Sequence, residues 1–354
     1  MKHVIGPTTS LCEICYRHIP AERFQEDRAL MISKTCPEHG KSVHMMEKQI
    51  LFVENLENNS SAYDASGYVL EITDRCNLKC PHCYQVPDNK KIDKPLESVL
   101  DQIANFPDDG ISITLAGAEP TMRKDLFDLI IEIKNLHIKT NHKPRGVNIL
   151  TNGVMLNKEE YVQGLIDADA DFVTIGLNHP DYQGQEIHNR QLNGIKNCVK
   201  LGLTIKNINY TLESLDQITF ILEEIQTFKD VAEEFRIRGG ADIGRSPDEE
   251  KTFLSDIVYE VFRQCETLKY TWDKLPADDN VYHYTVKING LEHRIIQWAD
   301  AKNVDLDELQ CGPWGSFVPN VPVTNLMHQV MLRDAAINNG MKLLDEVPER
   351  YIRK

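Results

Sequence analysis

The sequence predicts an α/β fold centred on a curved parallel sheet, a partial six-stranded (β/α)6 barrel. Short apolar runs of strand length alternate with longer stretches that carry apolar residues at three- and four-residue steps, from residue 67 to about 240. Six strands separated by five helices require parallel pairing and right-handed crossovers. Because chemistry gathers at the carboxyl ends of barrel strands, the residues that follow each strand are the candidates for function.

The strands and helices of this core follow from the two periodicities. The predicted strands are 68–73, 111–115, 146–150, 172–177, 204–211 and 235–237. The predicted helices are 95–106, 122–136, 157–168, 191–201 and 215–229. The predicted domains are a metal-binding ribbon at 1–48, a linker at 49–66, the barrel at 67–245 and an α+β extension at 246–354 that caps it.

Length and charge limit the possible functions. A chain of 354 residues is long enough for one large domain or two smaller ones, and its formal net charge of -15 argues against general affinity for nucleic acids or anionic membranes. Membrane spans and a signal peptide are not expected from the sequence. Nine cysteines, most of them in metal-type clusters, suit a reducing compartment. We therefore expect a cytoplasmic protein with no nucleic-acid partner and no transmembrane segment.

A second group of cysteines near the N-terminus predicts a metal site. Cys12 and Cys15 form a CxxC turn, and Cys36 and His39 lie in the segment CPEHG. Two such turns build a tetrahedral site for zinc, or for iron as in rubredoxin. His18 and His44 are alternative fourth ligands, and Cys36 could instead pair with a thiol elsewhere in the chain. Because a fragment this small has little core, the metal would supply much of its folding energy, although an electron relay is the functional alternative.

Three further thiols follow the first predicted barrel strand. Cys76, Cys80 and Cys83 stand in the segment CNLKCPHC. Thiolates select iron–sulfur clusters or zinc, and three closely spaced ligands argue for a site with one open position. The alternative is a set of buried or zinc-binding cysteines without catalytic function.

This spacing resembles the signature of the radical S-adenosylmethionine (radical SAM) superfamily. The resemblance implies a [4Fe–4S] cluster held by these three cysteines, with the methionine part of SAM on the fourth iron. The segment Gly117-Ala118-Glu119-Pro120 resembles the GGEP motif of that superfamily, with alanine at the second glycine, and Thr151-Asn152-Gly153 resembles its TNG turn. The ribbon together with the core is similar to a narrower group, the archaeal pterin methyltransferases and tetraether-lipid synthases.

The resemblance also implies which residues contact SAM. Glu119 would pair with the SAM ammonium, although the same segment could be an ordinary strand-to-helix turn capped by Thr121. Arg238 would meet the SAM carboxylate or an anionic substrate group, unless it is a solvated charge at a strand edge. The predicted SAM contacts are Tyr84, Gly117, Ala118, Glu119, Pro120, Thr151, Asn152, Asn178 and Arg238.

Alternation along the later strands predicts which side chains face the barrel lumen. Thr174, Gly176 and Asn178 share one face of their strand, opposite three aliphatic residues. On the last two strands the same rule groups the polar residues Asn207, Asn209, Thr211, Arg236 and Arg238. We expect this polar face to line the lumen.

The last hundred residues contain a helix at 248–269, a hairpin at 281–298 and a helix near 323–338. Asn289-Gly290 predicts a type I′ turn for the hairpin. Cys311, in a loop rich in glycine and proline, is a candidate hydrogen donor or acid on the substrate side, with ordinary packing as the alternative.

The resemblance implies reductive cleavage of SAM to a 5′-deoxyadenosyl radical that takes a hydrogen atom from a substrate. The electron donor would be a flavodoxin or ferredoxin. No second group of closely spaced cysteines appears near the C-terminus, and this favours a small-molecule or lipid substrate over a peptide. The reaction would be methylation, carbon–carbon or carbon–sulfur bond formation, or rearrangement. A non-catalytic iron–sulfur sensor or scaffold is the remaining alternative.

Overall fold

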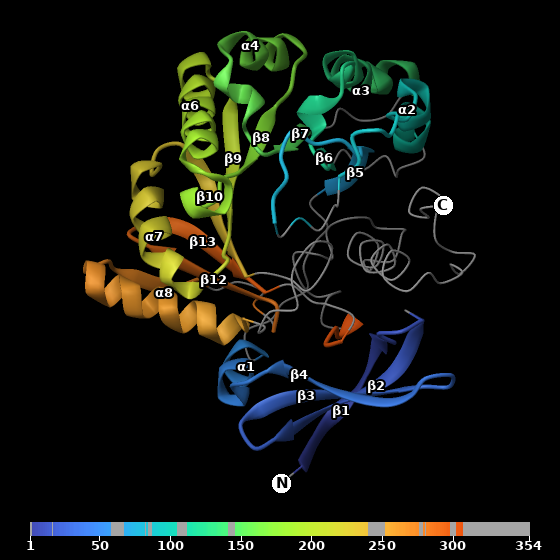
Figure 1. Cartoon of the computed structure of the whole chain (residues 1–354), viewed down its shortest axis with the longest axis vertical. Coiled ribbons are helices and arrows are strands. Elements are labelled where there is room, and N and C mark those ends of the chain that lie inside the picture. The colour runs from blue at the N-terminus through green and yellow to red at the C-terminus, as the bar shows by residue number, and fades with distance from the viewer. Residues whose placement is uncertain are drawn as a thin grey trace. The chain divides into compact units, whose positions relative to one another are not determined.

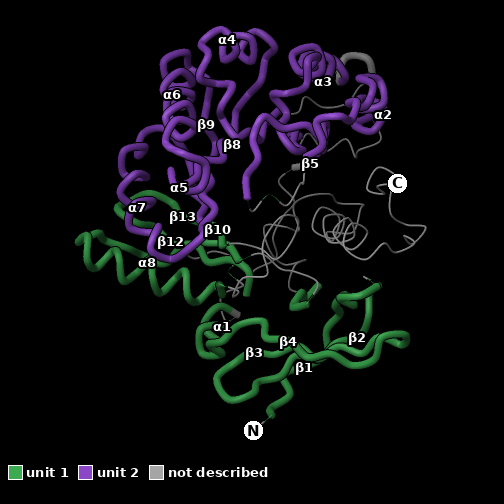
Figure 2. The backbone as a smooth tube through the Cα atoms, in the orientation of Figure 1, with its two compact units in different colours: residues 1–65, 82–84, 238–354 green, residues 66–81, 85–237 purple. Residues whose placement is uncertain are grey.

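The structure is a computed structural model, and it divides into two compact units (Figures 1 and 2). Unit 1 comprises residues 1–65, 82–84 and 238–354, and unit 2 comprises residues 66–81 and 85–237. The residues that it describes are 2–15, 17–57, 67–81, 83, 87–104, 112–140, 146–239, 252–275, 279, 281–297 and 302–306.

The core of unit 2 is a parallel sheet whose strands lie side by side in the order of the sequence. Its strands are β5 (Gly67–Thr73), β6 (Ser112–Gly117), β7 (Val147–Thr151), β8 (Phe172–Gly176), β9 (Thr204–Thr211) and β10 (Ala232–Arg238). Each strand from β5 to β8 pairs in parallel with the next, and β10 lies beside β9. The predicted α/β core is confirmed.

Helices connect these strands, as the alternating pattern predicted (Figure 1). They are α2 (Leu96–Ala104), α3 (Leu126–Thr140), α4 (Glu159–Asp167), α5 (Pro180–Gln183), α6 (Gln185–Leu201) and α7 (Ile218–Thr227). Helix α6 begins at Gln185 rather than near residue 191, because its first turns are polar and the apolar repeat starts later. It ends at Gly202, which takes the left-handed conformation that glycine adopts without strain.

The N-terminal part of unit 1 is an antiparallel sheet with the strand order β1-β2-β3-β4. The strands are β1 (Lys2–Leu11), β2 (His18–Glu26), β3 (Ala29–Cys36) and β4 (Gly40–Glu47). Within the segment 49–66, which the sequence predicts to be a linker, the structure forms α1 (Ile50–Glu57). Three of its buried side chains, Ile50, Val53 and Leu56, recur at three-residue steps on one helical face, and Phe52 is buried beside them in the sequence.

The C-terminal part of unit 1 contains α8 (Leu254–Leu268) and the strands β11 (Trp272–Lys274), β12 (His283–Ile288) and β13 (Leu291–Ile296). Asn289 and Gly290 both have positive φ angles, 47° and 85°, so the predicted type I′ turn forms. Val281, Tyr282 and Val304 join one apolar cluster with residues of β1 and β3. Cys311 and the helix predicted near 323–338 lie outside the described residues.

Among the helices that the structure describes, none combines the length and the apolar character needed to cross a membrane.

Candidate functional site

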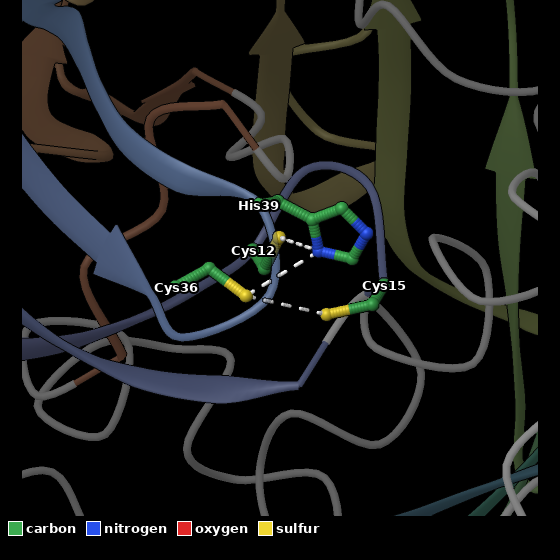
Figure 3. A group of neighbouring side chains, drawn as sticks. All are labelled: Cys12, Cys15, Cys36 and His39. Atoms are coloured by element: carbon green, nitrogen blue, oxygen red, sulfur yellow. Dashed lines mark hydrogen bonds between the residues drawn. The ribbon is translucent and has the colours of Figure 1, made fainter.

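The two turns of the N-terminal sheet bring Cys12, Cys15, Cys36 and His39 together (Figure 3). One candidate ligand atom from each residue lies within 4.8 Å of the other three. The two sulfurs of Cys15 and Cys36 are 3.8 Å apart, and His39 Nδ1 lies 3.4 Å from Cys36 Sγ and 3.6 Å from Cys12 Sγ. Zn–S bonds of about 2.3 Å and Zn–N bonds of about 2.0 Å at tetrahedral angles predict nearly these separations. The residues therefore fit a tetrahedral metal.

The chemistry of the thiols agrees with this geometry. Burial by itself raises the pKa of Cys36, but the backbone N–H of Glu38 and the side chain of His39 outweigh it and lower the pKa to about 6. Burial raises the pKa of Cys15 to about 11. A metal binds cysteine as the thiolate. One thiol that ionises near neutral pH, beside a second buried thiol, is therefore suited to bind a metal cation.

The alternative ligand His44 is engaged elsewhere. His44 Nε2 lies 3.0 Å from Glu13 Oε1, and the fully buried Lys34 reaches Glu13 Oε2 at 2.9 Å. Lys34 also donates to Leu11 O at 2.8 Å. His18, on β2, is exposed. The structure thus assembles His39, rather than either alternative, with the three cysteines.

The second cysteine group follows β5. Cys76 is buried at 7% exposure, whereas Cys80 and Cys83 are partly exposed. Cys83 belongs to unit 1, and Tyr84 lies outside the described residues.

Donor groups in unit 2 point at two of these sulfurs. The backbone N–H of Leu78 and the amide of Asn152 lie 3.3 Å and 3.8 Å from Cys76 Sγ. Gln183 Nε2 donates to Cys80 Sγ at 3.2 Å. N–H groups aimed at cysteine sulfur are the usual surroundings of a cluster thiolate, so the donor set fits an iron–sulfur cluster.

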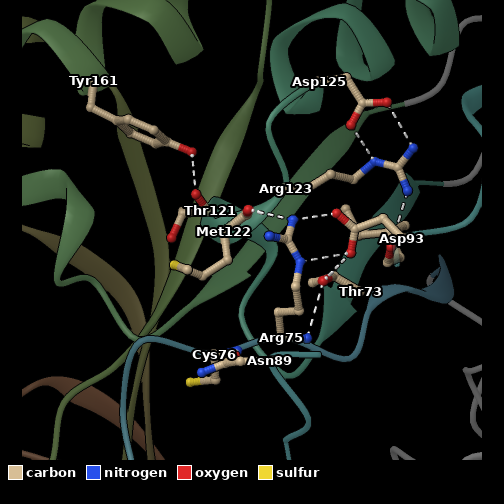
Figure 4. A network of polar contacts seen from close by, with 11 residues as sticks. Thr73, Arg75, Cys76, Asn89, Asp93, Thr121, Met122, Arg123, Asp125 and Tyr161 are labelled. Atoms are coloured by element: carbon tan, nitrogen blue, oxygen red, sulfur yellow. Dashed lines mark hydrogen bonds and ion pairs between the residues drawn. The ribbon is translucent and has the colours of Figure 1, made fainter. Parts of the chain in front are cut away.

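Arg75, the residue before Cys76, anchors the cysteine loop (Figure 4). Its guanidinium pairs with the carboxylate of Asp93 and donates to Met122 O at 2.8 Å, in the turn that follows β6. Thr73 donates to the same carboxylate at 2.6 Å. Burial alone would raise the pKa of Asp93, but these bonds hold it below its usual range. Protein contacts therefore fix the loop to the neighbouring turn.

The turn after β6 approaches β5 so closely that only glycine fits. Gly117 has a φ of 122°, and a Cβ atom there would lie 2.4 Å from Thr73 O. The next residue, Ala118, donates its N–H to that same oxygen at 3.0 Å. Arg123, buried at 3% exposure, adds a bond to Ile72 O at 3.0 Å. The first glycine of the predicted motif is thus explained by backbone contact.

Glu119 connects the turn after β6 to the turn after β7. Its carboxylate is 1% exposed and accepts four hydrogen bonds, from the N–H and hydroxyl of Thr121, the hydroxyl of Thr151 and the N–H of Asn152. Burial nevertheless raises its pKa. Because both oxygens already have protein donors, this side chain joins two turns, a role that the sequence did not predict. Its contact with the SAM ammonium stays a prediction.

A row of polar side chains crosses the sheet on the face predicted from alternation. Asn148 Nδ2 contacts Thr114 Oγ1 at 3.1 Å and Thr174 Oγ1 at 3.2 Å. The row continues through Asn207, whose Nδ2 donates to Glu234 Oε1 at 2.9 Å. Polar residues of β6, β7, β8, β9 and β10 therefore share one face, as an alternating strand pattern requires.

The remaining predicted contacts are placed as follows. Asn178 accepts from the N–H of Thr211 at 3.1 Å, so its side chain links the ends of β8 and β9. Arg236 pairs with Glu234 on its own strand. Arg238 is partly buried and falls in unit 1, and its role toward SAM stays a prediction.

A buried histidine network, missed in the sequence, supports the end of β8. His188 Nδ1 lies 2.9 Å from Asn178 O, and its Nε2 lies 2.7 Å from Glu224 Oε1. Tyr210 donates to the other oxygen of Glu224 at 2.7 Å. Its three members lie on α6, α7 and β9, so no local motif could have revealed it.

Comparison with known families decides the identity of this arrangement. Residues 70–233 match the radical SAM superfamily, and residues 4–48 match the "HMPTM N-terminal zinc ribbon domain". Residues 70–233 therefore form a radical SAM domain. Its N-terminal sheet is a zinc ribbon, and the two matches cover the two cysteine sites described above.

Two curated relatives match part of this chain. The chain is 28% identical over 235 residues to the 7,8-dihydro-6-hydroxymethylpterin dimethyltransferase of Methanocaldococcus jannaschii, which covers 55% of this chain and 44% of that protein. It is 34% identical over 154 residues to the probable GTP 3′,8-cyclase of Methanococcus aeolicus, covering 41% of this chain and 50% of that one. The chain spans about half the length of the curated relatives it matches.

Among solved structures, Streptococcus suis SuiB bound to S-adenosylmethionine matches with a TM-score of 0.47 and 17% identity, over 70% of this chain and 53% of that one. Native anSMEcpe with bound AdoMet matches with a TM-score of 0.43 and 19% identity, over 56% and 59% of the two chains.

Proposed function

We propose that this radical SAM protein is an enzyme that cleaves SAM reductively and abstracts a hydrogen atom from a small-molecule or lipid substrate. The observation that carries the proposal is the cysteine loop held by Arg75 to the turn after β6, which Glu119 in turn joins to the turn after β7. When bound, a reduced [4Fe–4S] cluster supplies the electron that breaks the S–C5′ bond of SAM and yields the 5′-deoxyadenosyl radical.

The residues of the chain have three tasks in this proposal. Cys76, Cys80 and Cys83 would hold the cluster. The turns that Glu119 joins would present backbone groups to SAM beside the cysteine loop. The polar row that includes Thr174 would orient ligands at the sheet face, because its fixed donors and acceptors need no rearrangement when a ligand binds.

The names of the relatives support a small-molecule substrate. One is a pterin dimethyltransferase and the other a probable GTP cyclase, and both of those substrates contain a fused nitrogen heterocycle. We propose a substrate of that class for this chain, with peptide modification as the alternative. The reaction would be methylation, bond formation or rearrangement.

Two further parts complete the proposal. The ribbon would hold zinc through Cys12, Cys15, Cys36 and His39, which the match to a zinc ribbon domain supports. Its closed four-ligand geometry would leave no position for a substrate and would make the metal structural. A flavodoxin or ferredoxin in the cytoplasm would deliver the electron to the cluster. The alternative metal in the ribbon is iron.

Anaerobic reconstitution of the full chain tests the enzymatic proposal. With iron, sulfide, SAM and dithionite, we expect 5′-deoxyadenosine, measured by chromatography. If none appears even when cell extract supplies possible substrates, the enzymatic proposal fails. Metal analysis of the protein as purified distinguishes zinc from iron in the ribbon.

Cys80→Ala tests the assignment of two separate metal sites. The variant should lose the cluster absorbance and keep the ribbon metal, and the buried Cys198→Ala should keep both. Loss of both metals in Cys80→Ala would contradict the assignment.

A further inference from the structure

Gln183 reaches the cysteine loop from a different part of the sequence, 103 residues away. It is the last residue of α5, the single turn that follows β8. The turn is closed by His179, which accepts from the N–H of Asp181 at 3.2 Å, and by the N–H of Gly184, which donates to Pro180 O at 2.7 Å. The backbone that carries Gln183 is therefore held in place independently of its side chain.

The side-chain amide of Gln183 makes one hydrogen bond in the described structure, from Nε2 to Cys80 Sγ at 3.2 Å. Its Oε1 is buried, and no donor reaches it within the part of the chain that the structure describes. A buried carbonyl without a donor destabilises a fold, so an apolar side chain of the same length would be more stable here. The amide of Gln183 is thus explained by its hydrogen bond to Cys80 Sγ rather than by a contribution to the stability of the fold.

The orientation of the amide follows from the charge on its neighbour. A cysteine that ligates iron is a thiolate, which repels a carbonyl oxygen and attracts an N–H group. The nitrogen of Gln183 therefore faces Cys80 whenever that sulfur is ligated. A flip of the side-chain amide, which would place the oxygen against the sulfur, is disfavoured.

We propose that Gln183 sets the reduction potential of the cluster through its hydrogen bond to Cys80, an inference that rests on the proposed function. Adding an electron to the cluster increases the negative charge on its sulfur ligands. An N–H dipole aimed at one of them stabilises the reduced form more than the oxidised form, and this raises the potential. Gln183 is a positioning and tuning residue, since it contacts a ligand of the cluster.

The test is a redox titration of the reconstituted full chain. The amount of reduced cluster is measured at each potential by electron paramagnetic resonance. Gln183→Met removes the donor at nearly constant length, and Gln183→Glu replaces it with a carboxylate. Gln185→Leu is the matched control, because Gln185 is exposed and bonds only its helix neighbour Asn189 among the described contacts.

We expect Gln183→Met to shift the potential to more negative values. At a fixed potential the ratio of reduced to oxidised cluster should fall by about three- to tenfold, the range for loss of one hydrogen bond. Gln183→Glu should shift it further in the same direction, and Gln185→Leu should match the wild type.

Equal potentials in the wild type and both Gln183 variants, at equal iron content, would overturn this inference and leave the proposed function intact. If the wild-type chain takes up no cluster, the proposed function fails first and this inference fails with it. If Gln183→Met does not fold, the potential of Gln183→Glu decides.

Discussion

In the zinc ribbon, all four candidate ligands come from two turns of one small sheet, within residues 12–39. In the radical SAM core, the cysteine loop follows β5 and is held by residues from several parts of the chain. Arg75 binds the turn after β6, while Asn152, after β7, and Gln183, after β8, contact the sulfurs of Cys76 and Cys80. The ribbon site is thus local in the sequence, whereas the support of the cysteine loop is spread over more than a hundred residues. The difference teaches that the candidate ligands of the ribbon are assembled by one small sheet alone, while the cysteine loop of the core depends on contacts with turns of a larger sheet.

Cys36→Ser tests the local character of the ribbon and has the largest expected effect. Binding of a structural zinc supplies about 10–16 kcal/mol of folding free energy in isolated zinc-finger peptides. The variant removes one candidate ligand and should lose much of such a contribution. We expect loss of the ribbon metal and rapid hydrogen exchange across β1 to β4, with protection of β6 to β9 unchanged. Rapid exchange in both units would show that the ribbon is not an independent folding element.

Gly117→Ala tests the dependence of the cysteine loop on its neighbours. A Cβ at this position would meet Thr73 O at 2.4 Å, so we expect a loss of about 3 kcal/mol or more of unfolding free energy, measured by urea denaturation. Gly202→Ala is the control, because Gly202 has a φ of 83° and open space around it. Its cost should be only the strain of the backbone, about 1–2 kcal/mol. Equal losses would contradict the close approach of β5 and β6.

Glu119→Gln sharpens the comparison with a smaller change. The amide replaces one accepting oxygen with an NH2 group that faces the N–H of Asn152 or the donors of Thr121 and Thr151. We expect a loss of about 1–3 kcal/mol of unfolding free energy and weaker binding of SAM by calorimetry. The ribbon metal should be unaffected. Unchanged stability would mean that the carboxylate does not join the two turns.

The pH dependence of the His188 network has the smallest expected effect. Burial lowers the pKa of His188, but the hydrogen bond and charge of Glu224 outweigh it and raise the pKa. Its contribution to stability is therefore complete below the unfolded pKa of about 6.5 and is lost as the pH rises through the higher folded value. The difference in unfolding free energy between the wild type and His188→Gln should be larger at about pH 6 than at about pH 9. A difference that grows with pH would contradict this sign.

The sequence predicted the elements that depend on local patterns. Strand β9 begins and ends at the predicted residues 204 and 211, and its polar and apolar residues alternate strictly from Asn207 to Thr211. The turn at Asn289-Gly290 follows from backbone conformations that these two residues adopt readily. Helix α1 was missed because its short apolar stripe is interrupted by charged and amide residues and becomes informative only when a sheet covers it.

By itself, the sequence determined the chemical kind of each site: thiols at fixed spacing in two places, and small residues where a backbone must approach closely. The tertiary structure decided which groups surround them. It selected His39 over His44 as the partner of the ribbon cysteines, used Glu119 to join two turns, and brought Gln183 to Cys80. The physical reason is that spacing along the chain fixes neighbours within one turn, while contacts between turns exist only after parallel strands have paired and brought their carboxyl ends to the same edge of the sheet.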